Sequence, residues 1–346
     1  MFGHSTGPTT GEFLFDAKAS KFGKEDAEAE EVNNIASAVG QIGFVTGAFR
    51  VAQPYPEGIT YDAANKRILL SSLTSNSIMS FDPSNGMSLT TTYTPDSANP
   101  SGMGLKVDSA TGQVYATIDS FTKQDNGGLA VYDIPVTSDT EAIATVVSTV
   151  NLPCTDGETK CGLANDVILD DSGVAYVTDS SVGRLLKAED GEIEVISDDS
   201  LLQWTDESFP FGANGMVHIA DSGILLVFNT QTRSLLRIDT TWDDVAEVAI
   251  NGEINGGGDG MLLSSDGILY AITGGTHITA FRSQDDWMSA DVIGSIDVST
   301  EGETATTMTF GETEDEIYVT HVRFGDLNGD GQNDDPSLIF KVSLNN

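Results

Sequence analysis

One phrase recurs six times along this chain of 346 residues. Each copy has a small polar entry, a short apolar strand, a turn rich in Asp and Gly, and a second apolar strand. The copies begin at Glu57, Gly102, Asn165, Asn214, Asp259 and about Thr304, roughly 45 to 63 residues apart. This spacing is typical of a propeller blade of four strands. The repeat therefore predicts six blades.

Segments from the two ends of the chain are predicted to form one blade together. A third and a fourth strand follow in the first five copies, whereas the sixth copy ends after its third strand at Leu344. The segment Phe44 to Val51 has a strand-like composition, and we expect it to supply the missing outer strand and to close the ring. The predicted fold is all-β, a six-bladed β-propeller of four antiparallel strands per blade over 43–346, after an N-terminal extension at 1–42. A β-sandwich with coincidental spacing is the alternative.

The charge balance excludes some partners. The chain has 53 Asp and Glu against 16 Lys and Arg, a net charge of -37. Binding to nucleic acid needs clustered basic residues, so nucleic acid is excluded as a natural partner, and an anionic membrane surface is disfavoured. A hydrophobic fraction of 39% suffices for a large core, and no apolar run is long enough for a membrane span. We expect a monomer whose partner is a small molecule.

The two cysteines, Cys154 and Cys161, flank a short polar loop. This spacing suits a local disulfide better than a zinc site, because no further Cys or paired His lies nearby; two free thiols are the alternative. A disulfide favours an oxidising compartment, either extracellular or periplasmic. The start of the chain lacks the features of a signal peptide, so the protein is either intracellular or its signal has been removed.

The residues that open the repeats predict a metal site. In a propeller blade the first strand begins at the mouth of the central channel, so these residues converge there. Glu57, Asn165, Asn214 and Asp259 would bring two carboxylates and two carboxamides together. Such an all-oxygen set suits a hard cation, Ca²⁺ above all, and its two negative charges balance the ion. The alternative is that Asn and Asp here only form turns.

Four short motifs carry a family resemblance. In chain order they are Pro56-Glu57-Gly58, Asn165-Asp166, Asn214-Gly215-Met216 and Asp259-Gly260-Met261. Together they resemble the senescence marker protein/gluconolactonase (regucalcin-like) family, which is related to diisopropyl fluorophosphatase and the paraoxonases. The resemblance covers about residues 44–344. It implies a catalytic divalent ion in the channel, held by Glu57, Asn165, Asn214 and Asp259, and hydrolysis of lactones, or in some branches of aryl esters or organophosphates.

One position departs from the family pattern. Sugar-lactone members often have an Arg two residues before the Asn of the third blade, and this chain has Leu163 there. A polyhydroxylated sugar lactone would lose a hydrogen-bonding partner. The departure favours a more apolar substrate.

The expected mechanism uses the ion to polarise a lactone carbonyl. Asp259 is the expected catalytic group, activating water or attacking directly, and Glu57 mainly holds the ion. His277 is the histidine predicted to lie in a loop on the metal face; it could transfer a proton or be a structural residue of the rim.

A second calcium site is predicted in the loop 322–336. Its oxygen-bearing residues alternate as in the first half of an EF-hand, with Gly331 at the sixth position, although the twelfth is Ser337 rather than Glu. The alternative is a merely polar loop. The candidate ligands are Asp326, Asn328, Asp330, Gln332 and Asp334.

The sequence thus favours a calcium-dependent hydrolase of lactones or related esters. The rival hypothesis is a non-catalytic propeller, stabilised by metal, that binds a ligand or a protein, because a fold does not determine an activity. A third is a condensing enzyme like strictosidine synthase, whose propeller needs no metal, and the four oxygen ligands argue against it.

Overall fold

The computed structural model shows a protein built almost entirely from strands. It describes residues 40–51, 55–75, 77–84, 90–93, 101–119, 127–136, 142–154, 162–240, 244–326 and 337–345. Within these ranges the helices are two short 3-10 turns, η1 (Ser200–Leu202) and η2 (Phe324–Asp326). No described helix is long and apolar enough to cross a membrane.

The strands form six antiparallel sheets of four, each starting with a different copy of the repeat. Blade 1 contains β3 (Ile59–Asp62), β4 (Arg67–Leu70), β5 (Ser77–Phe81) and β6 (Thr90–Tyr93). Blade 2 contains β7 (Ser101–Val107), β8 (Val114–Asp119), β9 (Gly128–Asp133) and β11 (Thr145–Asn151). Blade 3 contains β12 (Ala164–Leu169), β13 (Ala175–Asp179), β14 (Arg184–Glu189) and β15 (Glu192–Ser197).

The second half of the chain repeats this order. Blade 4 contains β16 (Ala213–Ile219), β17 (Ile224–Asn229), β18 (Ser234–Asp239) and β19 (Asp244–Glu247). Blade 5 contains β21 (Gly258–Leu263), β22 (Ile268–Thr273), β23 (His277–Arg282) and β24 (Ser289–Asp297). Blade 6 contains β25 (Thr304–Phe310), β26 (Glu316–Val322), β27 (Ser337–Leu344) and β2 (Gly43–Val51).

Short parallel additions extend two of the sheets. In blade 1, β10 (Ala142–Ile143) pairs with β6. In blade 5, β20 (Ala249–Asn251) and β1 (Gly40–Gln41) both pair with β24.

The first strands of the blades form a closed ring. Contacts run from β3 to β7, β12, β16, β21 and β25, and from β25 back to β3. This ring confirms the six-bladed propeller, and the six strands surround the channel that the repeat predicted. The residues that open the repeats therefore lie around one axis.

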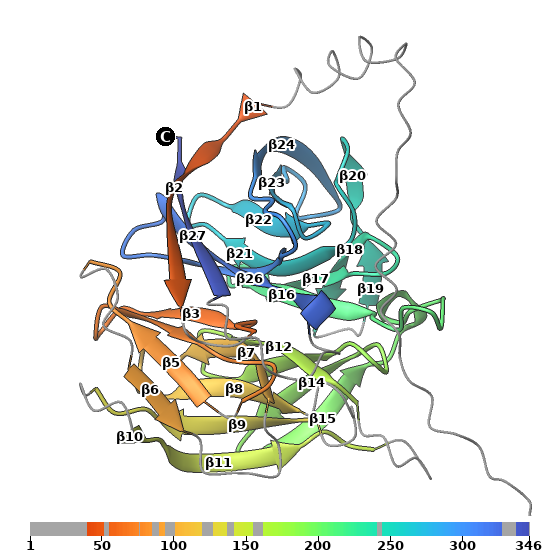
Figure 1. The fold of residues 1–346 in the computed structure, drawn as a ribbon. Helices are drawn as coiled ribbons and strands as arrows, with labels where there is room; N and C mark the ends of the chain where they lie inside the picture. The colour runs from red at the N-terminus through yellow and green to blue at the C-terminus, as the bar shows by residue number, and fades with distance from the viewer. Residues whose placement is uncertain are drawn as a thin grey trace, which may run out of the picture.

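The predicted closure of the ring is confirmed. Strand β2 pairs antiparallel with β27 from Gly43 opposite Leu344 to Val51 opposite Ser337, and Figure 1 shows the two lying side by side. An ion pair supports the junction, because the buried carboxylate of Glu303 lies 3.2 Å from Arg50. Residues 1–39 lie outside the described residues, so the boundary between extension and propeller stays a prediction.

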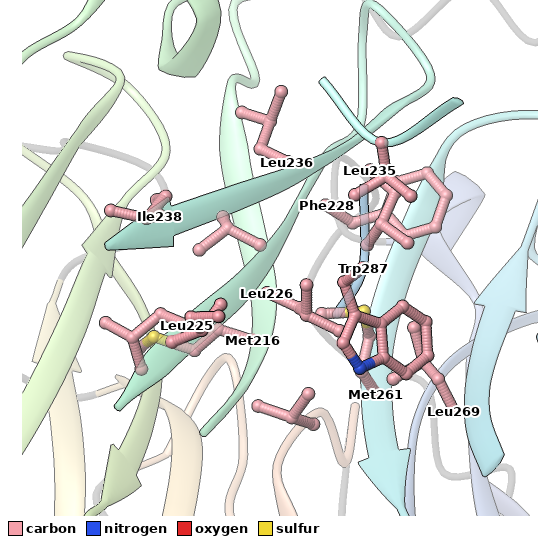
Figure 2. Close-up of a cluster of buried hydrophobic side chains, with 14 of the residues drawn as sticks. Met216, Leu225, Leu226, Phe228, Leu235, Leu236, Ile238, Met261, Leu269 and Trp287 are labelled. Carbon is pink, nitrogen blue, oxygen red and sulfur yellow. The ribbon is translucent and has the colours of Figure 1, made fainter. Parts of the chain in front are cut away.

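The apolar core lies between neighbouring blades. In the largest cluster, Met216 and Leu226 of blade 4 pack with Met261 and Leu269 of blade 5, and Trp287 closes the group (Figure 2). Burial of each side chain of this size stabilises the fold by about 1.5 to 3 kcal/mol. The six inner strands are thus held in fixed positions around the channel.

Candidate metal centre and substrate cavity

A β-bulge interrupts each first strand from blade 2 to blade 6 where the strand faces the channel. The pairing of the first with the second strand shifts register around two residues in each blade. A bulge redirects side chains locally. In blades 3, 4 and 5 the bulged pairs are Asn165-Asp166, Asn214-Gly215 and Asp259-Gly260. The predicted ligands are thus aimed at the axis by a repeated backbone irregularity.

Small residues after the ligands let neighbouring blades approach closely. A Cβ atom at Gly215 would overlap the backbone carbonyl oxygen of Asp259. A Cβ atom at Gly58 would overlap the carbonyl oxygen of Met103 in the same way. The Glu-Gly and Asn-Gly motifs therefore serve the packing of backbone against backbone at the centre of the ring.

Hydroxyl groups at the ends of the second strands bridge one blade to the next. Each donates a hydrogen bond to a backbone carbonyl in the first strand of the following blade, or just before it. The bonds join Ser71 Oγ to Met103 O (2.7 Å), Thr117 Oγ1 to Asn165 O (2.8 Å), Ser180 Oγ to Ala213 O (2.5 Å), Thr230 Oγ1 to Gly258 O (2.8 Å) and Thr320 Oγ1 to Glu57 O (3.2 Å). Five of the six blade junctions are bridged in this way, so the ligand-bearing backbone is fixed around the ring.

The four predicted ligands do converge. Glu57, Asn165, Asn214 and Asp259 line a small cavity of about 20 Å³ on the channel axis. The same four residues also line a larger cavity of about 590 Å³. Glu57, Asn165 and Asn214 are buried. The structure thus brings together the set that the sequence singled out, at the junction of two cavities, while its role in metal binding stays a prediction.

A third carboxylate, which the sequence analysis did not assign to the site, lies beside them. Asp166 lines the small cavity, and its two oxygens accept hydrogen bonds from the backbone N–H groups of Val167 (2.8 Å) and Met216 (3.0 Å). Asp166 occupies the position that is Gly215 and Gly260 in the next two copies. This exception to the repeat was the signal that could have identified it.

The pKa values of all three carboxyl groups are raised, and the charge of Asp166 contributes to the rise at Asp259 and at Glu57. Burial is the main cause for each, and it raises the pKa of Asp166 to about 6. Burial and the charge of Asp166 raise the pKa of Asp259 to about 7. Burial and the charges of Asp259 and Asp166 raise the pKa of Glu57 well above its ordinary value. Ionisation of all three groups is therefore unfavourable unless a positive charge lies nearby.

One half-buried cation, Lys106, shares a cavity with Asp166. Lys106 and Asp166 both line a cavity of about 220 Å³ that continues the channel. Burial lowers the pKa of Lys106, and the charge of Asp166 raises it. The charge of the ammonium group thus partly offsets that of Asp166.

The larger cavity has apolar walls. Leu73, Met103, Phe211 and Phe324 line it, and they pack with the buried Leu163 in one cluster. A third aromatic ring, that of Phe209, lines the cavity and stacks on Phe211 with 5.2 Å between ring centroids. Leu163 is fully buried and packs with the residues of this apolar wall, which fits the expectation of an apolar substrate.

The remaining predicted residues lie elsewhere. His277 begins β23 and its Nδ1 lies 2.9 Å from Thr276 Oγ1; it is not among the described residues that line the two cavities. Asp326 ends η2, but Asn328, Asp330, Gln332 and Asp334 lie outside the described residues, so the second calcium site stays a prediction. Cys161 also lies outside them, and the predicted disulfide with Cys154 stays a prediction.

Comparison with known proteins fits this geometry. The family model described as SMP-30/Gluconolactonase/LRE-like region matches residues 55–323, which is most of the chain. The chain belongs to this family. The match confirms the resemblance seen in the four motifs, and it includes all four candidate ligands. No curated protein sequence matches the chain.

Solved structures show that members of the SMP-30/gluconolactonase family and other proteins share the fold. The allergen Mala s 1 of Malassezia sympodialis is 17% identical with a TM-score of 0.67, over 86% of this chain and 96% of that one. Regucalcin of Agrobacterium tumefaciens, described as calcium-binding, is 16% identical with a TM-score of 0.61, over 88% and 97%. A gluconolactonase of Xanthomonas campestris is 15% identical with a TM-score of 0.59, over 88% and 96%.

Proposed function

We propose that this protein is a calcium-dependent hydrolase of lactones or related esters with apolar substituents. The observation that carries the proposal is that Glu57, Asn165, Asn214 and Asp259 line both the axial cavity and the larger apolar cavity. An ester carbonyl held in the larger cavity would lie next to an ion held in the smaller one. The membership of the SMP-30/gluconolactonase family supports hydrolysis of lactones as the reaction.

The residues present fit a calcium ion. The cavity of about 20 Å³ has room for one occupant the size of a water molecule. Among the described residues, no cluster of three or more His, Cys, Asp or Glu side chains is arranged to hold a metal, so the two carboxamides are needed to complete the donor set. A set of carboxylate and amide oxygens favours Ca²⁺ over softer ions.

The chain's own residues would carry out the chemistry around that ion. When bound, the ion would polarise the scissile carbonyl as a Lewis acid. Asp259 would take a proton from a water molecule as the water oxygen attacks the carbonyl carbon. The ring C–O bond then breaks, and the leaving alkoxide takes up the proton, which gives a hydroxy acid. Asn214, which hydrogen-bonds to Asp259, would keep the carboxylate in position.

The apolar walls would select the substrate. Phe209 and Phe211 supply flat hydrophobic surface, and Leu163 leaves a hydroxyl-rich ring without the guanidinium that many sugar-lactone members have. We therefore expect aliphatic or aromatic lactones to be better substrates than sugar lactones.

The test is a pH-stat assay over aliphatic, aromatic and sugar lactones and aryl esters, with calcium and after EGTA. Asp259→Asn should lower kcat by at least about 100-fold at saturating calcium, the effect expected for loss of a general base. Asp221→Asn removes the same charge from an exposed turn and should leave the rate unchanged. Turnover that survives EGTA would contradict the metal dependence. Tight calcium binding without turnover of any compound would favour the non-catalytic binding propeller.

A further inference from the structure

Blade 4 carries an arginine at a position where its neighbour has glycine. After β17, the N–H of Arg233 donates to the carbonyl of Asn229 at 3.0 Å, and after β13 the N–H of Gly183 donates to the carbonyl of Asp179 at 2.9 Å. The two turns are equivalent, with a φ of 63° at Arg233 and 75° at Gly183. This backbone region favours glycine. An arginine there is held at a conformational cost, which points to a role for its side chain.

The side chain of Arg233 is exposed and lines the 590 Å³ cavity. Within the described part of the chain, its guanidinium makes no hydrogen bond or ion pair. By contrast, the buried Arg184, next to Gly183, binds Asp179 at 2.8 Å. Of the non-glycine residues that the structure describes with positive φ, Arg233 is the one that lines this cavity.

The charges around the cavity single out Arg233 further. The charged residues among those described as lining it are Glu57, Asp259 and Arg233. A divalent ion would neutralise the two carboxylates, which leaves one positive charge in a cavity of a protein with a net charge of -37. A guanidinium binds a carboxylate through two parallel hydrogen bonds, which are stronger than bonds between neutral groups.

We propose that Arg233 is the anion-binding residue of this cavity, and that the preferred substrates are lactones or esters with a carboxylate on an apolar chain. The inference rests on the proposed function for the reaction, but the binding of an anion by Arg233 does not require turnover. One end of the substrate would lie at Glu57 and Asp259, and the carboxylate at Arg233. The acidic protein would otherwise repel an anionic compound, so tighter binding of such a compound would indicate a specific anion site.

The test is calorimetry on the calcium-loaded full chain with a homologous series of linear dicarboxylates and the matched monocarboxylates. At least one dicarboxylate should bind about tenfold or more tightly than its monocarboxylate partner, because a charge-assisted hydrogen bond contributes about that much. Arg233→Gln should abolish the difference, whereas Arg282→Gln should keep it. Arg282 is an exposed arginine that does not line the cavity, so its loss changes the net charge equally.

A second variant separates function from folding. Arg233→Gly should raise the melting temperature, because glycine suits the positive φ, and should abolish the dicarboxylate preference. In the turnover arm, Arg233→Gln should lower kcat/KM for lactones with a side-chain carboxylate about tenfold and leave neutral lactones unchanged.

The outcomes distinguish the two proposals. If no compound is hydrolysed but dicarboxylates still bind more tightly through Arg233, the hydrolase proposal is overturned and the anion site is supported. Hydrolysis with no preference for dicarboxylates, or with one that Arg233→Gln does not change, would overturn the role of Arg233.

Discussion

The side-chain nitrogen of Asn165 donates a 2.8 Å hydrogen bond to the hydroxyl of Ser180. An amide has its donors on nitrogen and its acceptor on oxygen, so this bond determines which end remains for the channel. Asn214 makes the equivalent bond to Thr230 Oγ1 at 2.9 Å. Both side-chain carbonyl oxygens thereby remain available to the proposed calcium ion, and the same two hydroxyls tie blade 3 to blade 4 and blade 4 to blade 5.

Ser180→Ala should weaken calcium binding. Loss of a group that orients a ligand typically lowers metal affinity by about 10- to 100-fold. Calorimetric titration of calcium into the protein, stripped with EGTA and desalted, measures the change. Ser71→Ala is the matched control, because Ser71 bridges Gly58 and Met103 by backbone contacts without touching a ligand side chain. Equal losses of affinity in both variants would show that general loosening of the ring, and not orientation of Asn165, is responsible.

The sequence predicted the ring and its closure because these depend on repetition. The number of repeated motifs gives the number of blades. Because the sixth copy ends after its third strand at Leu344, another segment, β2, has to supply its outer strand. The four ligand candidates followed from the same logic, since equivalent positions in a closed ring meet at the axis. Topology alone was enough to bring Glu57 near Asp259.

The parts of the site that break the repeat could not be predicted from it. Asp166 stands where the next two copies have glycine, and Lys106, which lines the same cavity, comes from another blade and meets it only in the folded ring. The apolar wall uses Phe209, Phe211 and Phe324 from connections that share no pattern between blades. Such contacts depend on the path of each connection, which single-sequence periodicity does not specify.

Gly215→Ala should damage both folding and metal binding. The added methyl group would overlap the carbonyl oxygen of Asp259, so blades 4 and 5 must separate at the axis. Overpacking of this kind costs about 1 to 3 kcal/mol, and here it displaces a ligand as well. Chemical denaturation with and without calcium should show a smaller stabilisation by calcium than in the wild type. Gly223→Ala, in an open hairpin turn of positive φ, controls for strain alone and should keep the full calcium effect.

The stability of the metal-free protein should fall as the pH rises from about 4 to about 7. The folded-state pKa of Asp259 is raised to about 7, so the folded chain keeps a proton that the unfolded chain has released in this window. Asp259→Asn removes the contribution of Asp259 and keeps those of Asp166 and Glu57, so its stability relative to the wild type should grow with pH by as much as about 4 kcal/mol. Denaturation in EGTA at a series of pH values measures it. A pH-independent difference between the two proteins would contradict the raised pKa.

Lys106→Met should make the stability of the protein depend more strongly on calcium. Lys106 is the cation that lowers the pKa of Asp166, so its removal leaves the Asp166 carboxylate uncompensated and should destabilise the metal-free protein. The extra negative charge beside the site should at the same time strengthen calcium binding, so calcium should raise the melting temperature further than in the wild type. In the double variant with Asp166→Asn, the rise in melting temperature caused by calcium should return towards the wild-type value. If calcium raises the melting temperature of Lys106→Met by the same amount as in the wild type, Lys106 does not influence calcium binding at this site.

Gln231→Ala should weaken substrate binding without affecting the metal. The Gln231 side chain accepts hydrogen bonds from the N–H groups of Thr205 (2.5 Å) and Asp206 (2.9 Å), and donates to the carbonyl of Phe209, so it clamps the loop that carries the aromatic wall. Its loss should raise KM for apolar lactones several-fold, because each hydrogen bond contributes about 1 kcal/mol to holding the loop. The kcat and the calcium affinity should stay unchanged. Gln203→Ala removes an exposed amide that bonds the carbonyl of Asp198, and it should leave KM as it is. A fall in kcat instead would show that Gln231 takes part in the chemical step rather than supporting the aromatic loop.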